Sequence, residues 1–431
     1  MKVLVVGGGG REHALAWRLR QDDPRIELYA APGNPGIAAL ATCVPIGATQ
    51  IDALLAFARQ ERIGWTLVGP EIPLSLGIAD AFAAAGLPIF GPTRAAAQVE
   101  SSKSYSKTLM IDAGVPTARA AVCTTVAEAH RAIDEIGAPV VVKASGLAAG
   151  KGVIICAAAG EARAAADGML AGDSFGDAGA TVLIEEFMEG EELSLFVLTD
   201  GERVLALPAA QDHKRLLDGD RGPNTGGMGA YCPVSLAEQS PELVSEVLET
   251  IVRPTLAAMR ERGTPFCGLL YVGLMLTTTG PRVVEFNCRF GDPETEAVLP
   301  AIAPSAPLAG LMELIARGER LPENIDLSAT RSAVTTVLAA DGYPEHPRKG
   351  DAIEMPAVPA DVLVFHAGTA RRDDGRLVTA GGRVLAVTGV ADSLAAAQQR
   401  SQAFAASVQF AGRQYRTDIG WRELERRAGV T

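Results

Sequence analysis

The 431-residue sequence lacks three features that would each define a class of protein. Its six cysteines form no Cys-x-x-Cys pair and no His/Cys spacing typical of a metal site, which excludes a disulfide scaffold and favours reduced thiols. Its 51 acidic residues outnumber 39 lysines and arginines, and the net charge of −12 disfavours nucleic-acid binding, which needs a basic face. No uncharged apolar run reaches the roughly 18 residues of a membrane span, and the chain opens on an apolar run without a signal-peptide pattern. We therefore expect a soluble cytoplasmic protein.

The length of the chain predicts several domains. A prior of roughly 100 to 200 residues per domain gives two to four. The first hundred residues alternate short apolar strands with helices, which predicts a doubly wound parallel sheet. A longer segment of strands and helices follows, and the last hundred residues hold several strands and a final helix near 393–408. We expect domains over residues 1–100, 101–320 and 321–431.

The run from Val283 to Glu296 combines a pair of metal-binding residue types with an arginine. Side chains alternate along a strand, so Glu285 and Asn287 point to the same face. Magnesium prefers oxygen ligands and is usually held by one or two carboxylates together with nucleotide phosphates. Arg289 offers a planar fork of donors that binds carboxylates and phosphates. The run predicts a magnesium site beside an anion pocket; the alternative is a strand with a solvated polar end.

The residues after this strand predict the start of a helix. Asp292 is a typical N-cap residue and Pro293 a typical first helical residue, so we expect a helix from Pro293 towards Ile302. Its N-terminus would face the anion that Arg289 holds.

Two glycine-rich loops resemble nucleotide-binding motifs without matching them. The loop Gly7–Gly10 follows a strand and precedes a helix, but Glu12 stands where a dinucleotide motif has its third glycine, so NAD binding is not expected. Its amides can still bind an anion, and a tight turn in a parallel sheet is the alternative. The loop Gly146–Gly152 lacks the Walker A residues, and a strand follows it instead of a helix.

The second glycine loop predicts a β-hairpin flap. Lys143 on the incoming strand and Lys151 in the turn would place two cations beside backbone amides that can cover a triphosphate. A hairpin that binds no ligand is the alternative.

Acidic residues and a long loop follow the flap. The run Glu185–Met188 ends a strand and can present backbone groups to an adenine, while Glu192 can accept hydrogen bonds from a ribose. A solvated acidic face is the common alternative. The charged loop 211–231 is of a length that compact domains rarely keep unless the loop binds or covers something. Within it Lys214 can reach a terminal phosphate, whereas His213 is as compatible with a structural role as with a catalytic one.

Taken in this order, the flap lysine, the glutamates, the long loop and the Glu-x-Asn strand resemble the ATP-grasp superfamily. Within it the chain is similar to the phosphoribosylamine–glycine ligase family. The motifs that carry this resemblance are GGGGREH from Gly7, GNPG from Gly33, GPE from Gly69, KASGLAAGKGV from Lys143, QDHKR and GPNTGGMGAY in the long loop, EFNCRFGDPE from Glu285, and the C-terminal HAGTA, GGRVLAV and YRTDIG. The resemblance spans nearly the whole chain.

The resemblance implies an α/β fold in three parts. These are an N-terminal doubly wound parallel-sheet domain, a central ATP-grasp fold of two α+β subdomains with the flap subdomain near 122–190, and a small C-terminal mixed β-sheet domain. It implies ATP-dependent ligation of glycine to 5-phosphoribosylamine through glycyl phosphate, giving glycinamide ribonucleotide, ADP and phosphate in de novo purine biosynthesis. The cofactors would be ATP and Mg²⁺ or Mn²⁺. We expect no nucleic-acid or membrane partner, and a monomer or weak homo-oligomer.

The resemblance also implies roles for single residues. Glu285 and Asn287 would hold the metal, and Arg289, Lys214 and Asp212 would lie near glycine and the transferred phosphate. ATP would contact residues of the central domain, namely Lys103, Lys107, Lys143, Gly150, Glu185, Glu186, Phe187, Met188 and Glu192. Phosphoribosylamine would face residues of the first domain, namely Gly9, Gly10, Arg11, Glu12, Asn34 and Glu71.

Some alternatives stay open. Lys103 and Lys107 lie one helical turn apart, and either can be the lysine that contacts ATP. Many superfamily members have an acidic metal ligand where this chain has Gly273, so a second metal would be held less directly or through water. The competing functions are another ATP-grasp enzyme acting on a different carboxylate, and a nucleotide-binding regulator without catalysis.

Overall fold

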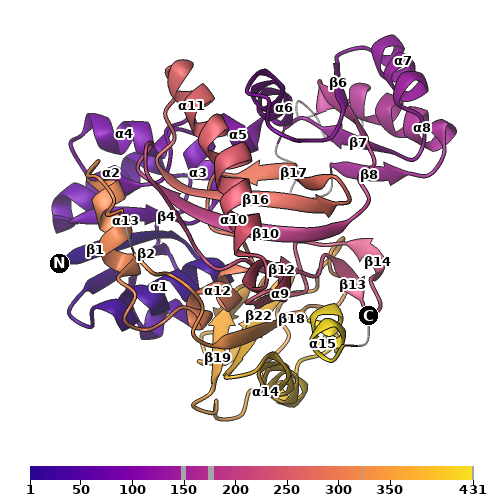
Figure 1. The fold of residues 1–431 in the computed structure, drawn as a ribbon. Helices are drawn as coiled ribbons and strands as arrows, with labels where there is room; N and C mark the ends of the chain where they lie inside the picture. Colours follow the sequence, from indigo (N-terminus) through magenta and orange to yellow (C-terminus); the bar gives the residue numbers. More distant parts are fainter. Residues whose placement is uncertain (147–151, 173–178, 324, 430–431) are drawn as a thin grey trace.

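The computed structural model describes residues 1–146, 152–172, 179–323 and 325–429. Its N-terminal part is a five-stranded parallel sheet with the order β3-β2-β1-β4-β5 (Figure 1). The strands are β1 (Lys2–Gly7), β2 (Glu27–Pro32), β3 (Thr42–Cys43), β4 (Trp65–Val68) and β5 (Ile89–Phe90). The helical segments are α1 (Gly10–Asp22), η1 (Ile37–Ala39), α2 (Ile51–Glu61), α3 (Glu71–Ser75), α4 (Ile78–Ala84) and α5 (Gln98–Ser101).

Helices cover both faces of this sheet, as the sequence predicts. Val3 and Val5 of β1 are fully buried in one core together with Leu15 of α1. Leu4 of β1 points the other way, into a second core with Leu54 of α2. Burial on both faces explains why β1 is a continuous apolar run. The predicted doubly wound parallel sheet is confirmed.

The flap forms a small antiparallel sheet with its own core, at the upper right of Figure 1. Its strands are β6 (Ala120–Cys123), β7 (Val140–Ala144), β8 (Val153–Cys156) and β9 (Val182–Glu186), in the order β6-β9-β7-β8, and its helices are α7 (Val126–Ile136) and α8 (Ala159–Leu170). The predicted hairpin is confirmed, because β7 and β8 pair with Lys143 opposite Val153. Its turn, with Gly150 and Lys151, lies outside the described residues.

A second antiparallel sheet, β11-β10-β16-β17, occupies the middle of the molecule (Figure 1). Its strands are β10 (Glu191–Thr199), β11 (Val204–Ala206), β16 (Gly268–Thr277) and β17 (Gly280–Asn287). The helices of this part are α6 (Lys103–Asp112), α9 (Ser235–Glu238), α10 (Pro241–Val247), the π-helical η3 (Leu248–Val252) and α11 (Arg253–Glu261). α10, η3 and α11 follow one another without a break, so together they form one continuous helix with a π-helical middle.

The segment 211–231 contains strands, so the prediction of an irregular loop was wrong. It holds β12 (Gln211–Asp212), β13 (Arg215–Leu217), β14 (Arg221–Asn224) and β15 (Gly229–Cys232). β13 and β14 form a hairpin, while β12 and β15 join the C-terminal sheet. Strands of two to four residues are too short to show alternation, and β15 pairs with residues about a hundred positions away.

The C-terminal part is built on the sheet β12-β15-β18-β22-β19. Its own strands are β18 (Ser332–Ala339), β19 (Val362–His366) and β22 (Arg383–Ala391), with β20 (Thr369–Arg371) and β21 (Leu377–Thr379) forming a separate pair. The predicted last helix is confirmed as α14 (Leu394–Ser407), and a further helix, α15 (Trp421–Arg427), follows it. No helix in the described parts of the chain is long and apolar enough to cross a lipid bilayer.

The helix after the Glu-x-Asn strand begins later than predicted. α12 runs from Thr295 to Ala301 and α13 from Leu308 to Ala316, so Asp292 is not an N-cap and Pro293 is not helical. Asp292 instead pairs with Arg383 of the C-terminal sheet, with Oδ1 and Nη2 3.1 Å apart. A partner 91 residues away overrides the local capping preference.

Candidate active site

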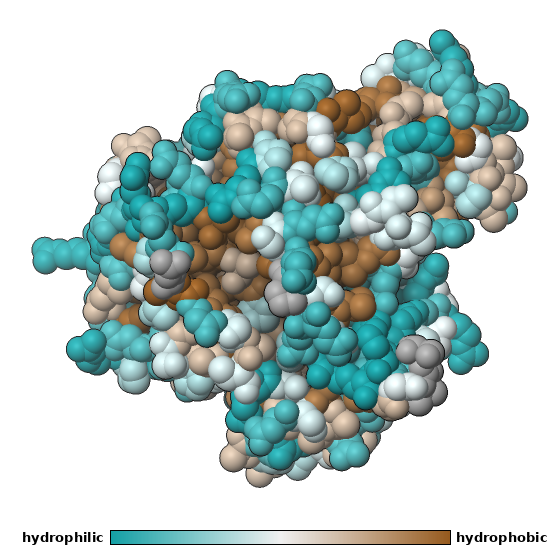
Figure 2. Space-filling view, viewed as in Figure 1, coloured by the Kyte–Doolittle hydropathy of each residue, from teal (hydrophilic) through white to brown (hydrophobic). Residues whose placement is uncertain are grey.

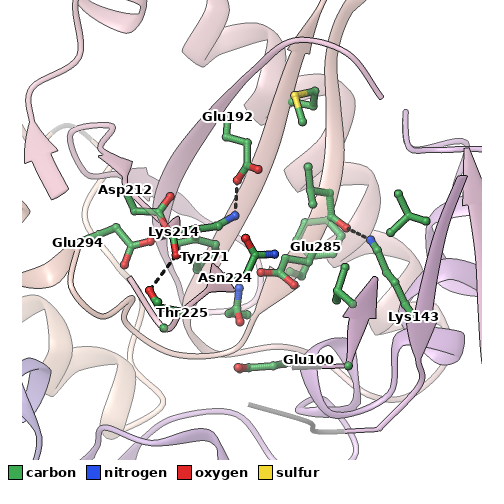
Figure 3. Close-up of a pocket in the computed structure, with 18 of the residues that line it drawn as sticks. Glu100, Lys143, Glu192, Asp212, Lys214, Asn224, Thr225, Tyr271, Glu285 and Glu294 are labelled. Atoms are coloured by element: carbon green, nitrogen blue, oxygen red, sulfur yellow. Dashed lines mark hydrogen bonds and ion pairs between the residues drawn. The ribbon is translucent and has the colours of Figure 1, made fainter. Parts of the chain in front are cut away.

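All three parts of the chain meet at one large cleft of about 1410 Å³. Arg11 and Glu71 line it from the N-terminal part, Lys143 from the flap sheet, and Tyr343 and Arg383 from the C-terminal part. Figure 3 shows charged residues converging on this space, with Lys214 beside Asp212 and Glu192, and with Glu285 near Lys143. Clefts between domains are common sites for ligands.

The predicted metal pair lies at the end of β17. Glu285 and Asn287 both line the cleft. Burial alone would raise the pKa of Glu285, but Lys214, Lys143 and Lys103 outweigh it, so this pKa lies below its ordinary value. An ionised carboxylate and an amide oxygen on one strand suit a hard divalent cation.

The rest of such a cation's shell would come from outside the protein. Within the described parts of the chain, no group of three or more His, Cys, Asp or Glu is placed to hold a metal ion. Arg289 Nη2 donates to Asn287 Oδ1 at 3.1 Å, and the second lone pair of that oxygen stays available. Gly273 lies directly opposite Glu285 on β16, where a Cβ would come within 3.4 Å of the glutamate Cγ. The site thus fits magnesium, which is usually completed by phosphates and water.

The two lysines of α6 have different surroundings. Lys107 Nζ is 3.0 Å from Glu185 Oε1, and it donates to Thr117 Oγ1 at 2.7 Å and to the Ala118 carbonyl at 3.2 Å. Lys103 Nζ donates to the Gly146 carbonyl at 3.0 Å, and no carboxylate of the described residues lies within ion-pair distance of it. Burial lowers the pKa of Lys103. Lys103 is therefore the lysine of this pair that can accept a new anion.

Glu185 connects two lysines across the cleft floor. Its Oε2 lies 2.6 Å from Lys143 Nζ, while its Oε1 meets Lys107. Burial would raise the pKa of Glu185, but Lys143 and Lys107 outweigh it and hold the pKa below its ordinary value. The Glu185 side chain is thus committed to ion pairs, and its backbone pairs with β6 and β7 within the flap sheet.

The hinge after β9 offers unused backbone donors. No residue of the described chain accepts a hydrogen bond from the backbone amides of Phe187 and Met188, which line the cleft. Glu186 points to Arg119 and Arg282, with Oε2 2.9 Å from Arg119 Nε, and its pKa falls to about 2 because these donors outweigh burial. Free amides beside apolar side chains fit the edge of an adenine.

Four charged residues form the opposite wall. Lys214 Nζ forms an ion pair with Glu192, the residue expected at a ribose. Burial raises the pKa of Asp212 to about 7; Lys214 opposes this shift, and Glu294 and Glu192 add to it. Glu294 in turn accepts a hydrogen bond from the Tyr271 hydroxyl at 3.1 Å.

Arg289 is held between two carboxylates. Its Nη2 is 2.8 Å from Glu100 Oε1 and its Nε is 3.5 Å from Glu71 Oε2. Burial would lower the pKa of Arg289, but these carboxylates outweigh it and raise the pKa further. Glu100 was not among the predicted residues, since it lies in a four-residue helix 189 positions before its partner and carries no local signal.

The predicted residues of the N-terminal loop divide into two groups. Arg11 and Glu71 line the cleft, whereas Gly9, Gly10 and Glu12 do not. Glu12 accepts hydrogen bonds from the Gly9 amide and from Arg11 Nε, both at 2.6 Å. It therefore stabilises the loop without lining the cleft.

Asn34 has a similar supporting position outside the cleft lining. Its side-chain amide donates to the Gly8 carbonyl at 3.0 Å and to the His366 carbonyl at 2.7 Å. Asn34 therefore ties the glycine loop to the C-terminal sheet.

Arg383 and Tyr343 are lining residues that sequence reasoning missed. Arg383 Nη1 donates to the carbonyls of Gly226, at 2.5 Å, and Asp292, at 2.8 Å, and the Tyr343 hydroxyl accepts from the Gly226 amide at 2.9 Å. Both come from the C-terminal part, and the GGRVLAV motif that contains Arg383 was the available signal.

Comparisons with known proteins agree along the whole chain. Three models of phosphoribosylglycinamide synthetase match: the N domain at residues 1–100, the ATP-grasp (A) domain at 101–295 and the C domain at 333–422. The chain is 48% identical to phosphoribosylamine–glycine ligase of Ralstonia nicotianae, over 99% of this chain and 100% of that one. It is likewise 48% identical to the enzyme of that name from Salmonella typhimurium, over 99% of both chains.

Solved structures show the same architecture. The crystal structure of phosphoribosylamine–glycine ligase from Thermotoga maritima matches with a TM-score of 0.85 and 33% identity, over 97% of this chain and 100% of that one. A biotin carboxylase domain from Hydrogenobacter thermophilus matches with a TM-score of 0.72 and 20% identity, over 96% of this chain and 91% of that one. The second likeness concerns the fold alone.

Proposed function

Because the chain belongs to the phosphoribosylglycinamide synthetase family and is an ATP-dependent ligase of glycine and 5-phosphoribosylamine in purine biosynthesis, we propose that it works through glycyl phosphate. A carboxylate resists attack by an amine. The γ-phosphoryl group of ATP is therefore transferred to a glycine carboxylate oxygen, which gives ADP. The ribosylamine nitrogen then attacks the carbonyl carbon, the bond from that carbon to the phosphate oxygen breaks, and the nitrogen loses a proton.

The charge distribution around Glu285 carries this proposal. Phosphoryl transfer depends on positioning and on neutralising negative charge. Lys103 lies on α6, Lys143 on β7 and Lys214 between β12 and β13, and all three lower the pKa of the same buried carboxylate. A cluster of cations around one metal-binding carboxylate is the arrangement that a triphosphate and its metal require.

The family uses ATP with a divalent metal, and Mg²⁺ is the ion we assign to Glu285 and Asn287, with Mn²⁺ as a substitute. The metal would neutralise charge on the transferred phosphate. Lys103, Lys143 and Lys214 hold the phosphates, Glu192 the ribose, and the backbone of Glu186 to Met188 the adenine. Arg289 and Asp212 are assigned to the glycine end of the cleft.

The N-terminal loop would receive phosphoribosylamine, with Arg11 and Glu71 facing it directly. Gly9, Glu12 and Asn34 shape that loop through the contacts described above, and Gly10 begins α1 directly after it. We further propose domains at 1–100, 101–320 and 321–431, a monomer or weak homo-oligomer, and a cytoplasmic enzyme. The last point is supported by the pathway and by six free cysteines.

A single assay tests the proposed reaction. The protein is incubated with MgATP, glycine and freshly prepared phosphoribosylamine, and ADP and glycinamide ribonucleotide are quantified. We expect ADP release that depends on both substrates, with bicarbonate and formate unable to replace glycine. Intact ATP binding without glycine-dependent ADP would overturn the assignment and favour another carboxylate substrate or a nucleotide-binding regulator.

A further inference from the structure

Lys214 sits at the base of a hairpin that the end of the chain holds in place. The hairpin β13–β14 begins at Arg215 and returns at Asn224. Its base is closed by Thr225, whose amide and hydroxyl both donate to the Lys214 carbonyl at 2.8 Å. Lys214 therefore moves with the hairpin. The surface over β13, β14 and α15 is largely hydrophilic (Figure 2), and beneath it Leu216 of β13 joins a small apolar cluster with Met228 and Ala339.

Arg416 joins the hairpin to the C-terminal segment. Its side chain is fully buried and makes charge-assisted hydrogen bonds to two aspartates. Nε and Nη2 donate to Asp418 at 2.7 and 2.8 Å, and Nη1 donates to Asp220 Oδ1 of the hairpin turn at 2.7 Å. A buried arginine with both partners in place is costly to displace, so the two segments stay together.

Three further hydrogen bonds join the hairpin turn to the same C-terminal segment. Asp218 accepts hydrogen bonds from the Thr417 amide at 2.8 Å and the Thr417 hydroxyl at 2.6 Å. The Gly219 amide donates back to Asp418 Oδ2 at 2.8 Å. Each segment thus donates hydrogen bonds to the other, and these bonds hold the hairpin turn against residues 417–418.

His213, the residue directly before Lys214, also contacts the C-terminal segment. Its Nε2 accepts a hydrogen bond from the Gly420 amide at 2.9 Å, while its Nδ1 lies 3.7 Å from Asp220 Oδ1. Accepting at Nε2 requires a neutral ring with its proton on Nδ1. Burial lowers the pKa of His213, which favours that neutral form. Its backbone amide donates to the Gly229 carbonyl at 2.8 Å.

We propose that His213 is a positioning residue, which holds Lys214 in place through the C-terminal segment Arg416–Gly420. The proposal rests on the proposed function, because it gives Lys214 the terminal phosphate of ATP. It also resolves the two roles that the sequence left open for His213: with Nε2 occupied by Gly420, this ring is not the proton carrier of the reaction.

Two substitutions at position 213 separate these roles. In His213→Gln the side-chain oxygen can take the place of Nε2 and accept from Gly420, whereas His213→Leu offers no acceptor. We expect His213→Leu to lower kcat about 10- to 100-fold, the loss typical of a reacting group displaced by about 1 Å. We expect His213→Gln to stay within about threefold of the wild type, since its hydrogen bond is kept.

A double-substitution test asks whether His213 acts through Lys214. In the Lys214→Ala background, His213→Leu should lower kcat by less than about twofold further, because residues acting as one unit are not additive. Arg427→Met is the matched control. Arg427 belongs to the same C-terminal region but bonds Glu423 and Glu238, away from the hairpin, and its replacement should leave kcat unchanged.

Nucleotide affinity gives a readout that does not depend on turnover. Lys214 would contact the terminal phosphate, so His213→Leu should reduce the preference for MgATP over MgADP as Lys214→Ala does, measured by calorimetry without glycine. Asp218→Ala, at the partly exposed turn, should shift this preference in the same direction and guards against a folding defect at position 213.

The outcomes are distinct. Loss in His213→Gln equal to that in His213→Leu, or full multiplicative loss in the Lys214→Ala background, would overturn the positioning role. Wild-type protein without glycine-dependent ADP release would overturn the proposed function instead, and the nucleotide-preference measurement would still decide the role of His213.

Discussion

Lys107 Nζ lies 3.0 Å from Glu185 Oε1 in the floor of the cleft, and both side chains are almost completely buried. Lys103, one turn earlier on α6, meets only the Gly146 carbonyl among the described residues. Lys107 therefore belongs to a buried ion network, whereas Lys103 faces the space for a ligand. We expect the removal of Lys107 to affect stability and the removal of Lys103 to affect ligand binding.

Lys107→Met should mainly lower stability, and Lys103→Met should mainly weaken ATP use. Lys107→Met leaves Glu185 paired with Lys143 but removes the donor from Glu185 Oε1, Thr117 Oγ1 and the Ala118 carbonyl. Because these buried acceptors lose their partner, we expect the free energy of unfolding to fall by roughly 2 kcal/mol. Lys103→Met should raise KM for ATP about tenfold, equivalent to ~1.4 kcal/mol of binding. Urea unfolding and steady-state kinetics on both variants distinguish the effects, and the reverse pattern would assign the ATP contact to Lys107.

Glu285→Gln should weaken the use of metal–ATP. The substitution keeps the shape of the side chain but removes the charge that Lys214, Lys143 and Lys103 now hold ionised. Metal ions contribute several kcal/mol to phosphoryl transfer, so we expect kcat/KM for ATP to fall roughly 100-fold.

A magnesium titration checks the assignment of Glu285. Glu285→Gln should need a higher Mg²⁺ concentration for half-maximal activity, whereas Asn287→Asp, which keeps an oxygen at the other ligand position, should retain more activity. Near-wild-type turnover of Glu285→Gln at low Mg²⁺ would remove this residue from the metal site.

The pair His13 and His366 should make the protein sensitive to acid. The His366 amide donates to His13 Nδ1 at 2.8 Å, and this contact joins the N-terminal and C-terminal parts. Burial lowers the pKa of His13 to about 3 and that of His366 to about 4. Unfolded histidines bind protons at higher pH than these, so stability is fully present above about pH 6.5 and is lost as pH falls towards 4.

Thermal unfolding between pH 7.5 and 4.5 measures this loss. His13→Asn keeps an acceptor near Nδ1 and removes one titrating ring, so its melting temperature should fall less steeply with acid. The exposed His346→Asn is the matched control and should follow the wild type. Parallel curves for all three proteins would show that acid acts elsewhere.

The strands and helices that could be predicted from the sequence are those whose own residues indicate their structure. The strand Val140–Ala144 is a β-branched run that leads into a glycine loop, and the structure has it as expected. The strands within 211–231 could not be predicted in this way, because β15 depends on pairing with β18 a hundred residues later. Tertiary contacts also moved the start of α12, since Asp292 pairs with Arg383.

The same limit applies to the site. The chemistry of Glu285, Asn287 and Lys143 is visible from residue type and spacing, and all three line one cleft. Glu100 lacks such a signal, because its role depends on Arg289, 189 positions later. Arg383 lies in the GGRVLAV motif, but its pairing with Asp292, 91 positions earlier, is not visible from that motif. Sequence spacing identifies which residues can bind a ligand, whereas long-range pairing decides which charges are already satisfied.

Asp212 provides a last prediction, in which stability and function oppose each other. Burial raises its pKa to about 7, with Glu294 and Glu192 adding to the shift against Lys214. A raised carboxyl pKa means that the folded state binds more protons than the unfolded state between about pH 4 and 7, so this carboxylate destabilises the fold as pH rises through that window. Asp212→Asn should therefore be more stable than the wild type at pH 8, by about 1 to 2 kcal/mol, and no more stable near pH 4. Its kcat should fall most above about pH 7, where the wild-type carboxylate is charged and faces Lys214. Urea unfolding at pH 4.5 and pH 8 tests the first part, and a gain of equal size at both values would show that Asp212 does not titrate in this range.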